Sequence, residues 1–373
     1  MQKKVRIAII LHGLQSSGDD VLFSYLSRFI DPDKISLTML LAVDKGDPQL
    51  YEEDVAGHGV RVIHLHDLDR GRILLWPWTL YRAFRQYGPF DGVHANMNML
   101  SGLNLLAARL AGVPLRISHA HSPAHMRDGS LFRKLYVRLM RALIHRSATI
   151  RLACSKSAGE YYYGSDPFVI LDNGIDVEKF IYNADKRLDK GKQDVRFLTV
   201  GRLAQDKNPL FLLDVFEAVH RKLPAASLTW VGAGEMKSEL QELVRKKNLT
   251  DAVRFLGQRK NVSNLMQEAD CFLFPSRYEA FGLALLEAQA TGLDCFASDT
   301  IPHKVDCGKC MFLSLEKSPE EWAEEILRYI ASEDRMKLDQ DKLRKYDIRV
   351  MADRLTRLYQ SGDPKSMETE SIF

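Results

Sequence analysis

The stretch ADCFLFPSRYEAFGLALLEA, residues 269–288, contains the change from strand to helix on which the fold prediction rests. It starts with a short apolar run of the kind that forms a buried strand. A polar loop follows, and a helix is expected to begin near Phe281 or Gly282. Glu279 lies in the loop and Glu287 lies one to two turns into the helix. These carboxylates either cap and solvate an ordinary helix or hold a ligand where the strand ends.

Short runs rich in apolar and β-branched residues recur along the chain, with helical segments between them. This alternation indicates right-handed βαβ crossovers and parallel sheets covered by helices on both faces. The polar segment 180–194 separates two series of runs and is interpreted as an interdomain connection. The predicted strands are residues 5–11, 35–43, 60–65, 92–96, 115–121 and 150–155, then 195–203, 227–234, 253–257, 269–276, 295–299 and 310–315.

A length of 373 residues also favours two domains, because it exceeds the usual size of one hydrophobic core. We expect an N-terminal domain over 1–180 and a C-terminal domain over 181–344. A helix at about 345–362 is expected to pack back on the first domain, and 363–373 to form a disordered tail. The apolar run 5–11 is too short for a signal peptide, and no stretch approaches the ~20 apolar residues of a membrane span. The lack of a signal peptide and of a membrane span, together with five cysteines, an odd number, favours a cytoplasmic chain without disulfides.

Ligands of open α/β sheets bind beyond the carboxyl ends of the strands. Gly201, Arg202 and Lys207 follow the first strand of the second domain. A guanidinium and an ammonium group beside a glycine suit a diphosphate, although a solvated basic loop gives the same pattern. Gly232 and Gly234 follow the next strand, where the simplest interpretation of G-x-G is a tight turn into a helix.

The loop and helix at 279–288 offer a second set of ligand groups. Backbone N–H groups of Gly282 and Leu283 at a helix N-terminus favour an anion. Ionised carboxylates accept hydrogen bonds, so Glu279 and Glu287 could hold the hydroxyl groups of ribose and hexose. The alternative is that Glu279 complements the helix dipole while Glu287 faces water.

The segments GRLAQDKNP, VGAGE, VRFLG, FPSRYEAFGLALLEA and ASD together resemble the nucleotide-binding half of the family-4 retaining glycosyltransferases. The resemblance extends along nearly the whole chain. VHANMNMLSGLNLLAARLAGVPLRISHAHS, ACSKSAGEYYYG and LDNGID in the first half are similar to the subgroup that builds bacterial exopolysaccharide and capsular repeat units. The resemblance implies the α/β fold class called GT-B, in which two Rossmann-like, doubly wound parallel-sheet domains face a central cleft.

The resemblance also implies roles for individual residues. Arg202 and Lys207 would bind and neutralise the donor diphosphate, with Gly201 and Gly234 on the same side of the sheet. Glu287 would hold the ribose hydroxyls, and Glu279 the transferred sugar. The region of Gly257 and Arg259 would receive the base. The backbone that would hold the sugar with Glu279 comprises Ala280, Phe281, Gly282 and Leu283.

The first domain contributes a histidine to this implied site. His121 matches the family's active-site histidine, near the sugar and the acceptor. His119 lies two residues away, on the same side of an extended strand, so either histidine could be the working one. We favour His121 and place both on the acceptor side.

The sequence departs from the family pattern at two places. The family usually has a Gly-Gly pair after the first strand, whereas this chain has HGLQSSGDD, in which Gly13 and Gly18 would have to let the backbone approach the diphosphate. Asp294 stands where the family often has proline.

The implied reaction needs neither a metal nor a cofactor. Positive charge from Arg202, Lys207 and the helix N-terminus can stabilise the departing nucleoside diphosphate. Retention would follow from front-side attack, without Glu279 as a covalent nucleophile. Metal sites are disfavoured at HLHDLDR, where His64, His66, Asp67 and Asp69 follow a first-domain strand, at HAHSPAH with His119, His121 and His125, and at the single C-x-x-C of Cys307 and Cys310.

Basic residues concentrate between Arg70 and Arg151, where thirteen Lys and Arg face two acidic residues, Asp91 and Asp128. The segment SLFRKLYVRLMRALIHRS predicts an amphipathic helix that lies either on anionic lipid or against its own sheet. Trp76 and Trp78 favour the membrane. No nucleic-acid recognition motif accompanies the charge.

We therefore expect a peripheral enzyme on the inner face of the cell membrane, with a nucleotide sugar, a UDP-sugar in our interpretation, and a lipid-linked saccharide as substrates. The alternatives are a GT-B sugar-nucleotide 2-epimerase and a nucleotide-sugar-binding protein without turnover. The donor sugar, the acceptor, the linkage and the oligomeric state are not encoded in any legible motif.

Overall fold

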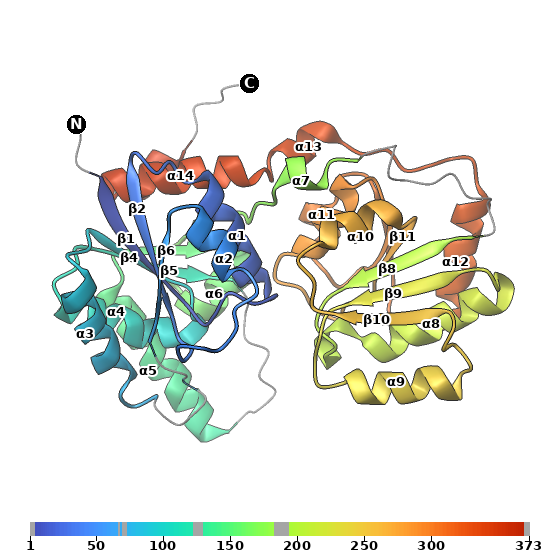
Figure 1. The fold of residues 1–373 in the computed structure, drawn as a ribbon, viewed down its shortest axis with the longest axis horizontal. Helices are drawn as coiled ribbons and strands as arrows, with labels where there is room; N and C mark the ends of the chain where they lie inside the picture. Colours follow the sequence, from blue (N-terminus) through green and yellow to red (C-terminus); the bar gives the residue numbers. More distant parts are fainter. Residues whose placement is uncertain (1–3, 66–67, 69–72, 122–129, 183–193, 369–373) are drawn as a thin grey trace. The chain divides into compact units, whose positions relative to one another are not determined.

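The computed structural model describes residues 4–65, 68, 73–121, 130–182 and 194–368. The chain forms two compact units (Figure 1). Unit 1 comprises Met1–Gly174 and Ile348–Phe373, and unit 2 comprises Ile175–Asp347. The first boundary lies at 174/175 rather than at 180/181, because the helix Val177–Phe180 packs against two helices of unit 2. Among the described residues, no helix combines the length and apolar character that crossing a membrane requires.

Unit 1 is built on a parallel sheet of seven strands in the order β3-β2-β1-β4-β5-β6-β7. β2 and β3 lie on one side of β1, and β4 to β7 lie on the other. The topological switch point of this doubly wound sheet is therefore between β1 and β4. The bounds are β1 Val5–Leu11, β2 Ile35–Leu41, β3 Arg61–His64, β4 Gly92–Ala95, β5 Leu115–Ala120, β6 Ile150–Ala153 and β7 Val169–Ile170.

Unit 2 repeats this plan with six parallel strands in the order β10-β9-β8-β11-β12-β13, so that its switch point lies between β8 and β11. The bounds are β8 Arg196–Val200, β9 Ser227–Val231, β10 Val253–Gly257, β11 Cys271–Phe274, β12 Asp294–Ser298 and β13 Cys310–Leu313. The predicted fold class is confirmed, and each of the twelve predicted runs overlaps a strand. The sequence interpretation missed β7, a strand of two residues.

Helices connect the strands in both units. Those of unit 1 are α1 Gly18–Phe29, α2 Glu52–Gly57, α3 Trp76–Tyr87, α4 Ser101–Leu110, α5 Leu131–Ser147, α6 Lys156–Tyr163 and α14 Ile348–Ser361. Those of unit 2 are α7 Val177–Phe180, α8 Pro209–Lys222, α9 Lys237–Lys246, α10 Val262–Glu268, α11 Leu283–Ala290, α12 Pro319–Ala331 and α13 Gln340–Arg344. Short 3₁₀ turns lie at Asn98–Leu100, Gln205–Lys207, His303–Val305 and Pro364–Met367.

The last helix, α14, packs against α1 and β1 of unit 1 (Figure 1). It does so because its apolar residues recur at helical spacing and are buried, among them Leu355, Leu358 and Tyr359. The tail was predicted to be disordered from residue 363, whereas Pro364–Met367 forms a 3₁₀ turn in which Met367 is buried. Residues 369–373 lie outside the described residues.

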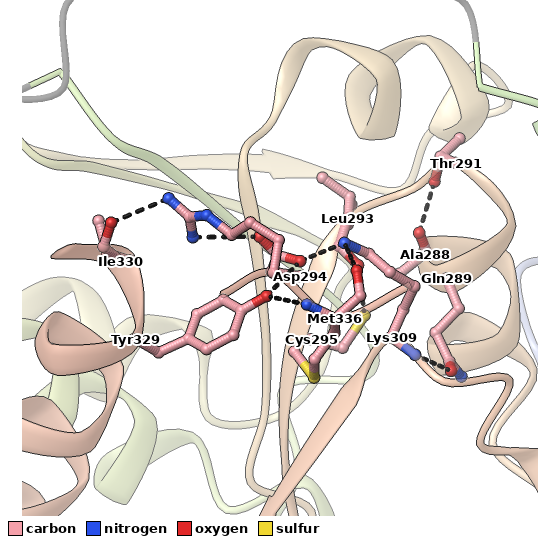
Figure 2. A network of polar contacts seen from close by, with 11 residues as sticks. Ala288, Gln289, Thr291, Leu293, Asp294, Cys295, Lys309, Tyr329, Ile330 and Met336 are labelled. Carbon is pink, nitrogen blue, oxygen red and sulfur yellow. Dashed lines mark hydrogen bonds and ion pairs between the residues drawn. The ribbon is translucent and has the colours of Figure 1, made fainter. Parts of the chain in front are cut away.

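Asp294, the residue that replaces the family's frequent proline, has a structural role at the amino end of the unit 2 sheet. Figure 2 shows its carboxylate between Lys309 and Tyr329. The Lys309 ammonium and the Tyr329 hydroxyl both donate to Oδ1, the latter over 3.0 Å. Arg335 approaches Oδ2 at 3.5 Å. These contacts tie β12 to α12 and to the segment that follows it.

Candidate functional site

A hollow lies at the carboxyl ends of β8 and β11, the two strands that flank the switch point of unit 2. This is where an open parallel sheet leaves room for a ligand, because the crossovers on either side leave in opposite directions. The backbone and side chains that line it are Thr199, Val200, Gly201, Arg202, Lys207, Leu212, Trp230, Phe274, Pro275 and Ser276. Gly201, Arg202 and Lys207, three of the predicted donor-binding residues, therefore border one hollow.

Lys207 and Glu279 form an ion pair beside this hollow. The Lys207 Nζ atom lies 2.7 Å from Glu279 Oε1, although 72 positions separate the two residues. The Ser276 hydroxyl donates to the same carboxylate oxygen over 2.9 Å. The two predicted residues are brought together because the loops after β8 and β11 leave neighbouring strands at the same end of the sheet.

Arg202 lies in the same loop as Lys207 but has a different partner. Its guanidinium donates to Asp206 over 3.0 Å, and its side chain is 60% exposed. Asp206 Oδ2 also lies 3.5 Å from Lys207 Nζ, so one carboxylate serves both cations. The Arg202 side chain is mostly exposed, whereas those of Lys207 and Asp206 are 21% and 31% exposed, so the three form one partly solvated group of charges.

The helix α11 begins at Leu283, with Gly282 as its N-cap. Gly282 has φ +94°, a conformation that side chains rarely adopt, which explains the glycine at this point. Phe281 is buried, and Ala280 is half-buried in the loop before it. The first N–H groups of the helix have no partner within the helix and so are available for hydrogen bonding to an anion or a hydroxyl.

Glu287 is buried, with 6% of its surface exposed. The alternative that this residue faces water does not fit the structure. Its helix is buried around most of its circumference, because every residue from Leu285 to Ala290 is buried. A carboxylate in such a helix is retained at a cost in solvation, which is a common feature of functional sites.

The remaining donor-binding candidates of unit 2 lie in the loops after β9 and β10. A Cβ added to Gly234 would lie 2.4 Å from the backbone oxygen of Leu203, so this glycine is required for close packing of two loops. Met236 N–H donates to that same oxygen over 3.0 Å. Arg259 is exposed after β10, and its guanidinium donates to the carbonyl of Gln258.

The two histidine candidates of unit 1 lie at the carboxyl end of β5 and touch one another. The ring centroids of His119 and His121 are 4.0 Å apart, and both side chains are buried. His121 Nε2 lies 3.0 Å from the Asn96 side-chain oxygen. Burial lowers the pKa of both rings, although Asp19 and Asn173 oppose this effect at His121, so both are neutral at pH 7.

The loop after β1 is held by side chains rather than by a second glycine. Leu14 N–H donates to Gln49 Oε1 over 2.8 Å, and Gln15 N–H donates to Asp20 over 3.0 Å. A Cβ on Gly13 would lie 2.8 Å from that Gln49 oxygen. Gly18 is exposed as the first residue of α1. Burial and the neighbouring Asp19 raise the pKa of Asp20 to about 7.

Sequence reasoning missed several residues that complete these clusters. Ser276 directly follows β11, and the rule that sites follow strands could have found it. Asp206 lies between two predicted residues but carried no signal of its own. His94 lies within a predicted strand, and its contact with Tyr359 spans 265 positions, which no local pattern encodes.

The predicted absence of metal sites concerns three groups of His, Asp and Cys residues. Within 4–65, 68, 73–121, 130–182 and 194–368, no group of three or more His, Cys, Asp or Glu side chains is arranged to hold a metal ion. His66, Asp67, Asp69 and His125 lie outside the described residues. The thiols of Cys307 and Cys310 are buried, and burial raises the pKa of Cys307 to about 12.

Two family models match the chain, one for each half. The model described as "Glycosyltransferase Family 4" matches residues 25–179, and "Glycosyl transferases group 1" matches residues 181–347. The second match contains the Lys207–Glu279 pair and the hollow beside it. The first contains the histidine pair.

Sequence identity to curated proteins and superposition on a solved structure are consistent with these family matches. EpsF of Bacillus subtilis is 32% identical over 88% of this chain and 88% of its own. The "UDP-Gal:alpha-D-GlcNAc-diphosphoundecaprenol alpha-1,3-galactosyltransferase" of Escherichia coli is 30% identical over 59% of this chain and 60% of its own. The crystal structure of Anabaena HepE "in complex with UDP and glucose" superimposes with a TM-score of 0.76 at 17% identity, covering 96% of this chain and 100% of the other. The chain, with two doubly wound units and its basic hollow at a switch point, thus belongs to the family-4 glycosyltransferases of GT-B fold.

Proposed function

We propose that this glycosyltransferase moves a sugar from a nucleoside diphosphate sugar, a UDP-sugar, to a lipid-linked saccharide acceptor in exopolysaccharide or capsule biosynthesis. The transfer retains the configuration of the sugar and needs no metal. Arg202 and Lys207 bind the diphosphate, Glu287 the ribose, and Glu279 with the backbone of 280–283 the sugar. Arg259 contributes to the base site, and His121 with His119 lies on the acceptor side.

The ion pair of Lys207 with Glu279 is the observation that carries this proposal. It joins a cation suited to a diphosphate with a carboxylate suited to sugar hydroxyls, 2.7 Å apart at a sheet's switch point. A bound diphosphate would draw Lys207 away from Glu279 and leave the carboxylate to accept from hydroxyl groups. Positive charge from Lys207 and Arg202 would then stabilise the leaving phosphate, the role that a metal has in other transferases.

The names of two similar proteins support the choice of substrates. The Escherichia coli relative is named for a UDP-linked donor and a diphosphoundecaprenol-linked acceptor, and the Anabaena structure contains UDP. Both names are compatible with a diphosphate site at Arg202 and Lys207. They favour transfer over 2-epimerisation or binding without turnover.

The decisive experiment incubates the purified protein with a panel of nucleotide sugars, with and without a polyprenyl-diphosphate-linked sugar, in the presence of EDTA. Transfer in EDTA, with a product whose anomeric configuration matches the donor by NMR, is the expected result. Epimerised donor would favour the 2-epimerase instead. If the protein bound nucleotide sugars saturably but formed no product with any donor or acceptor, it would be a nucleotide-sugar-binding protein without turnover.

The outer face of α5 supports a membrane-bound acceptor. Leu131 is 79% exposed and Phe132 86%, and Leu135 and Leu139 continue the same face. Lys134 and Arg138 are exposed beside them. Large apolar side chains at the surface, flanked by cations, suit the boundary of an anionic bilayer, where each basic residue contributes ~1 kcal/mol. These exposures support lipid, rather than the unit's own sheet, as the partner of this face, while Met140 and Ile144 on another face are buried.

A second exposed apolar group of the same kind lies at the start of α3, where Leu74 precedes the helix. Of the two tryptophans expected to favour the membrane, Trp76 is buried and Trp78 is exposed. Leu74 is 90% exposed and Trp78 57%. Arg82 lies over the Trp78 ring at 5.5 Å. We propose that α3 and α5 both contact anionic lipid and so bring the enzyme to its acceptor.

Sedimentation with liposomes tests the membrane contact. The protein should sediment with phosphatidylglycerol-containing vesicles at low salt and much less with phosphatidylcholine alone. Leu131→Ser with Phe132→Ser should abolish sedimentation, whereas Leu110→Ser, which changes an exposed leucine at the end of α4, should not. If both variants sedimented with the vesicles as well as the wild-type protein does, α5 would not be a membrane contact.

A further inference from the structure

Four aromatic side chains of unit 1 form a buried polar chain next to the proposed acceptor site. The Tyr359 hydroxyl from α14 lies 2.7 Å from His94 Nδ1 on β4. His94 Nε2 lies 3.1 Å from His119 Nδ1 on β5. The His119 ring then contacts the His121 ring, with centroids 4.0 Å apart. The chain therefore links the C-terminal helix to the histidine that the proposed function uses.

The direction of the hydrogen bonds in this chain follows from counting protons. Burial lowers the pKa of His94 to about 3 and that of His119 well below 6.5, so each ring carries a single N–H proton. If Tyr359 donates to His94, then His94 donates from Nε2 to His119 Nδ1, and the proton of His119 is on Nε2. The reverse order would leave the buried Tyr359 proton without the acceptor that His94 supplies, which is costly.

The hydrogen bonds of Asn96 place the proton of His121. Asn96 donates its amide N–H to the His94 carbonyl over 3.2 Å, which orients its amide so that the oxygen accepts from His121. The His121 proton is then on Nε2, and Asn173 also acts on this ring, since it opposes the fall in the pKa of His121 caused by burial. Within the described part of the chain, the buried His119 Nε2 atom has no hydrogen-bond partner.

We propose that Tyr359 is a positioning residue that acts through His94 to fix the proton of His119 on Nε2. The enzyme thereby presents a hydrogen-bond donor at His119 Nε2. The oxygen of a hydroxyl group accepts hydrogen bonds, so this donor suits a hydroxyl of the sugar or of the acceptor saccharide. The hydroxyl assignment rests on the proposed function, whereas the proton positions do not.

Histidine NMR of the full-length protein tests the proton positions directly. In protein labelled with ¹⁵N-histidine, long-range ¹H–¹⁵N correlations distinguish a protonated Nδ1 from a protonated Nε2. All three rings are expected to carry the proton on Nε2, with signals assigned through single His→Gln variants. A His119 ring protonated on Nδ1 in the wild-type protein would overturn the proposal, whatever the variants show.

Tyr359→Phe then tests the positioning role. It removes only the hydroxyl, so His119 should become a mixture of tautomers, and kcat should fall roughly tenfold to a hundredfold with little change in KM for the donor. Tyr163→Phe is the matched control, because this buried hydroxyl bonds to Ser118 and Leu152 and to no histidine. It should leave the His119 tautomer unchanged.

The outcomes separate this inference from the proposed function. An unchanged His119 tautomer in Tyr359→Phe, or the same change in Tyr163→Phe, contradicts the positioning role. If the His119 tautomer changes but kcat does not, the row of hydrogen-bonded side chains from Tyr359 to His119 has no role in the reaction. If the wild-type protein transfers no sugar from any donor, the proposed function fails while the NMR result stands. If Tyr359→Phe does not fold, the wild-type tautomers alone decide.

Discussion

Two lysine–carboxylate ion pairs lie at opposite ends of the unit 2 sheet. Lys207 pairs with Glu279 beyond the carboxyl ends of β8 and β11, and Lys309 pairs with Asp294 at the amino ends of β12 and β13. Their burial is similar, since the side chains are 21% and 12% exposed in the first pair and 10% and 15% in the second. Burial alone therefore does not distinguish them.

The partners around the two pairs differ. Asp294 also accepts from Tyr329 and lies near Arg335, and Lys309 also donates to the Met336 carbonyl over 3.1 Å. These partners come from α12 and the segment after it, as Figure 2 shows. Lys207 and Glu279 belong to two loops beside a hollow instead. An ion pair enclosed by structural partners serves stability, whereas one beside a hollow can exchange its partner for a ligand.

The largest effect is expected from Asp294→Ala, which leaves Lys309 without its buried counterion. Breaking a buried pair from one side costs about 3–5 kcal/mol of unfolding free energy. Urea unfolding of the variant measures this loss. Transfer per folded molecule should not change, because the pair is at the other end of the sheet from the hollow.

Glu324→Ala is the control for this change. Glu324 pairs with Lys222 at the surface, where both side chains are more than half exposed, and such pairs contribute less than about 1 kcal/mol. If Asp294→Ala destabilises the protein no more than Glu324→Ala, the network around Asp294 has no structural role.

The next effect is expected from Lys207→Ala. Removing a charge that stabilises the leaving phosphate should lower kcat/KM by about 10²–10³-fold. The unfolding free energy should fall less than in Asp294→Ala, because Glu279 keeps Ser276 as a partner and lies in a loop beside the hollow. Lys222→Ala, at the surface pair, should change neither quantity. If Lys207→Ala lost much of its stability but kept normal kinetics, the Lys207–Glu279 pair would have the same structural role as the Lys309–Asp294 pair.

Glu287→Ala extends the comparison to a carboxylate inside α11. If Glu287 holds the ribose, its loss should weaken nucleotide-sugar binding by about 10-fold to 100-fold, the range of hydrogen bonds to a charged group. Calorimetric titration with UDP measures this. Glu239→Ala, an exposed residue of α9, should bind normally. Unchanged affinity in Glu287→Ala would assign the residue a structural role.

The strands were predictable from the sequence because each is a short apolar run bounded by polar or turn residues. The exception was β7, which at two residues is too short for a periodic pattern. The start of α11 was predicted within two residues. The structure adds the reason, since the left-handed backbone of Gly282 ends the loop and the helix begins at the next residue.

The candidate site was predictable to the extent that it follows from strand ends. That rule indicated Lys207 and Glu279, which lie in different loops yet meet at 2.7 Å. It could not indicate that Asp206 also contacts Lys207, because this depends on the conformation of a short 3₁₀ turn. The contact of His94 with Tyr359 depends on the packing of the last helix and was equally beyond local patterns.

The smallest effect is expected from Asp206→Asn, which tests whether the cations beside the hollow exchange a protein partner for a ligand. Asp206 contacts both Arg202 and Lys207, so in the ligand-free protein it competes with a diphosphate for the two cations. Exposed pairs contribute less than about 1 kcal/mol, so UDP should bind roughly 2-fold to 5-fold more tightly to the variant. Asp214→Asn, which removes the same charge at Lys247, is the control and should leave the affinity unchanged. Weaker binding in Asp206→Asn would mean instead that Asp206 holds the two cations in place for the ligand, so that the pairing prepares the site rather than competing for it.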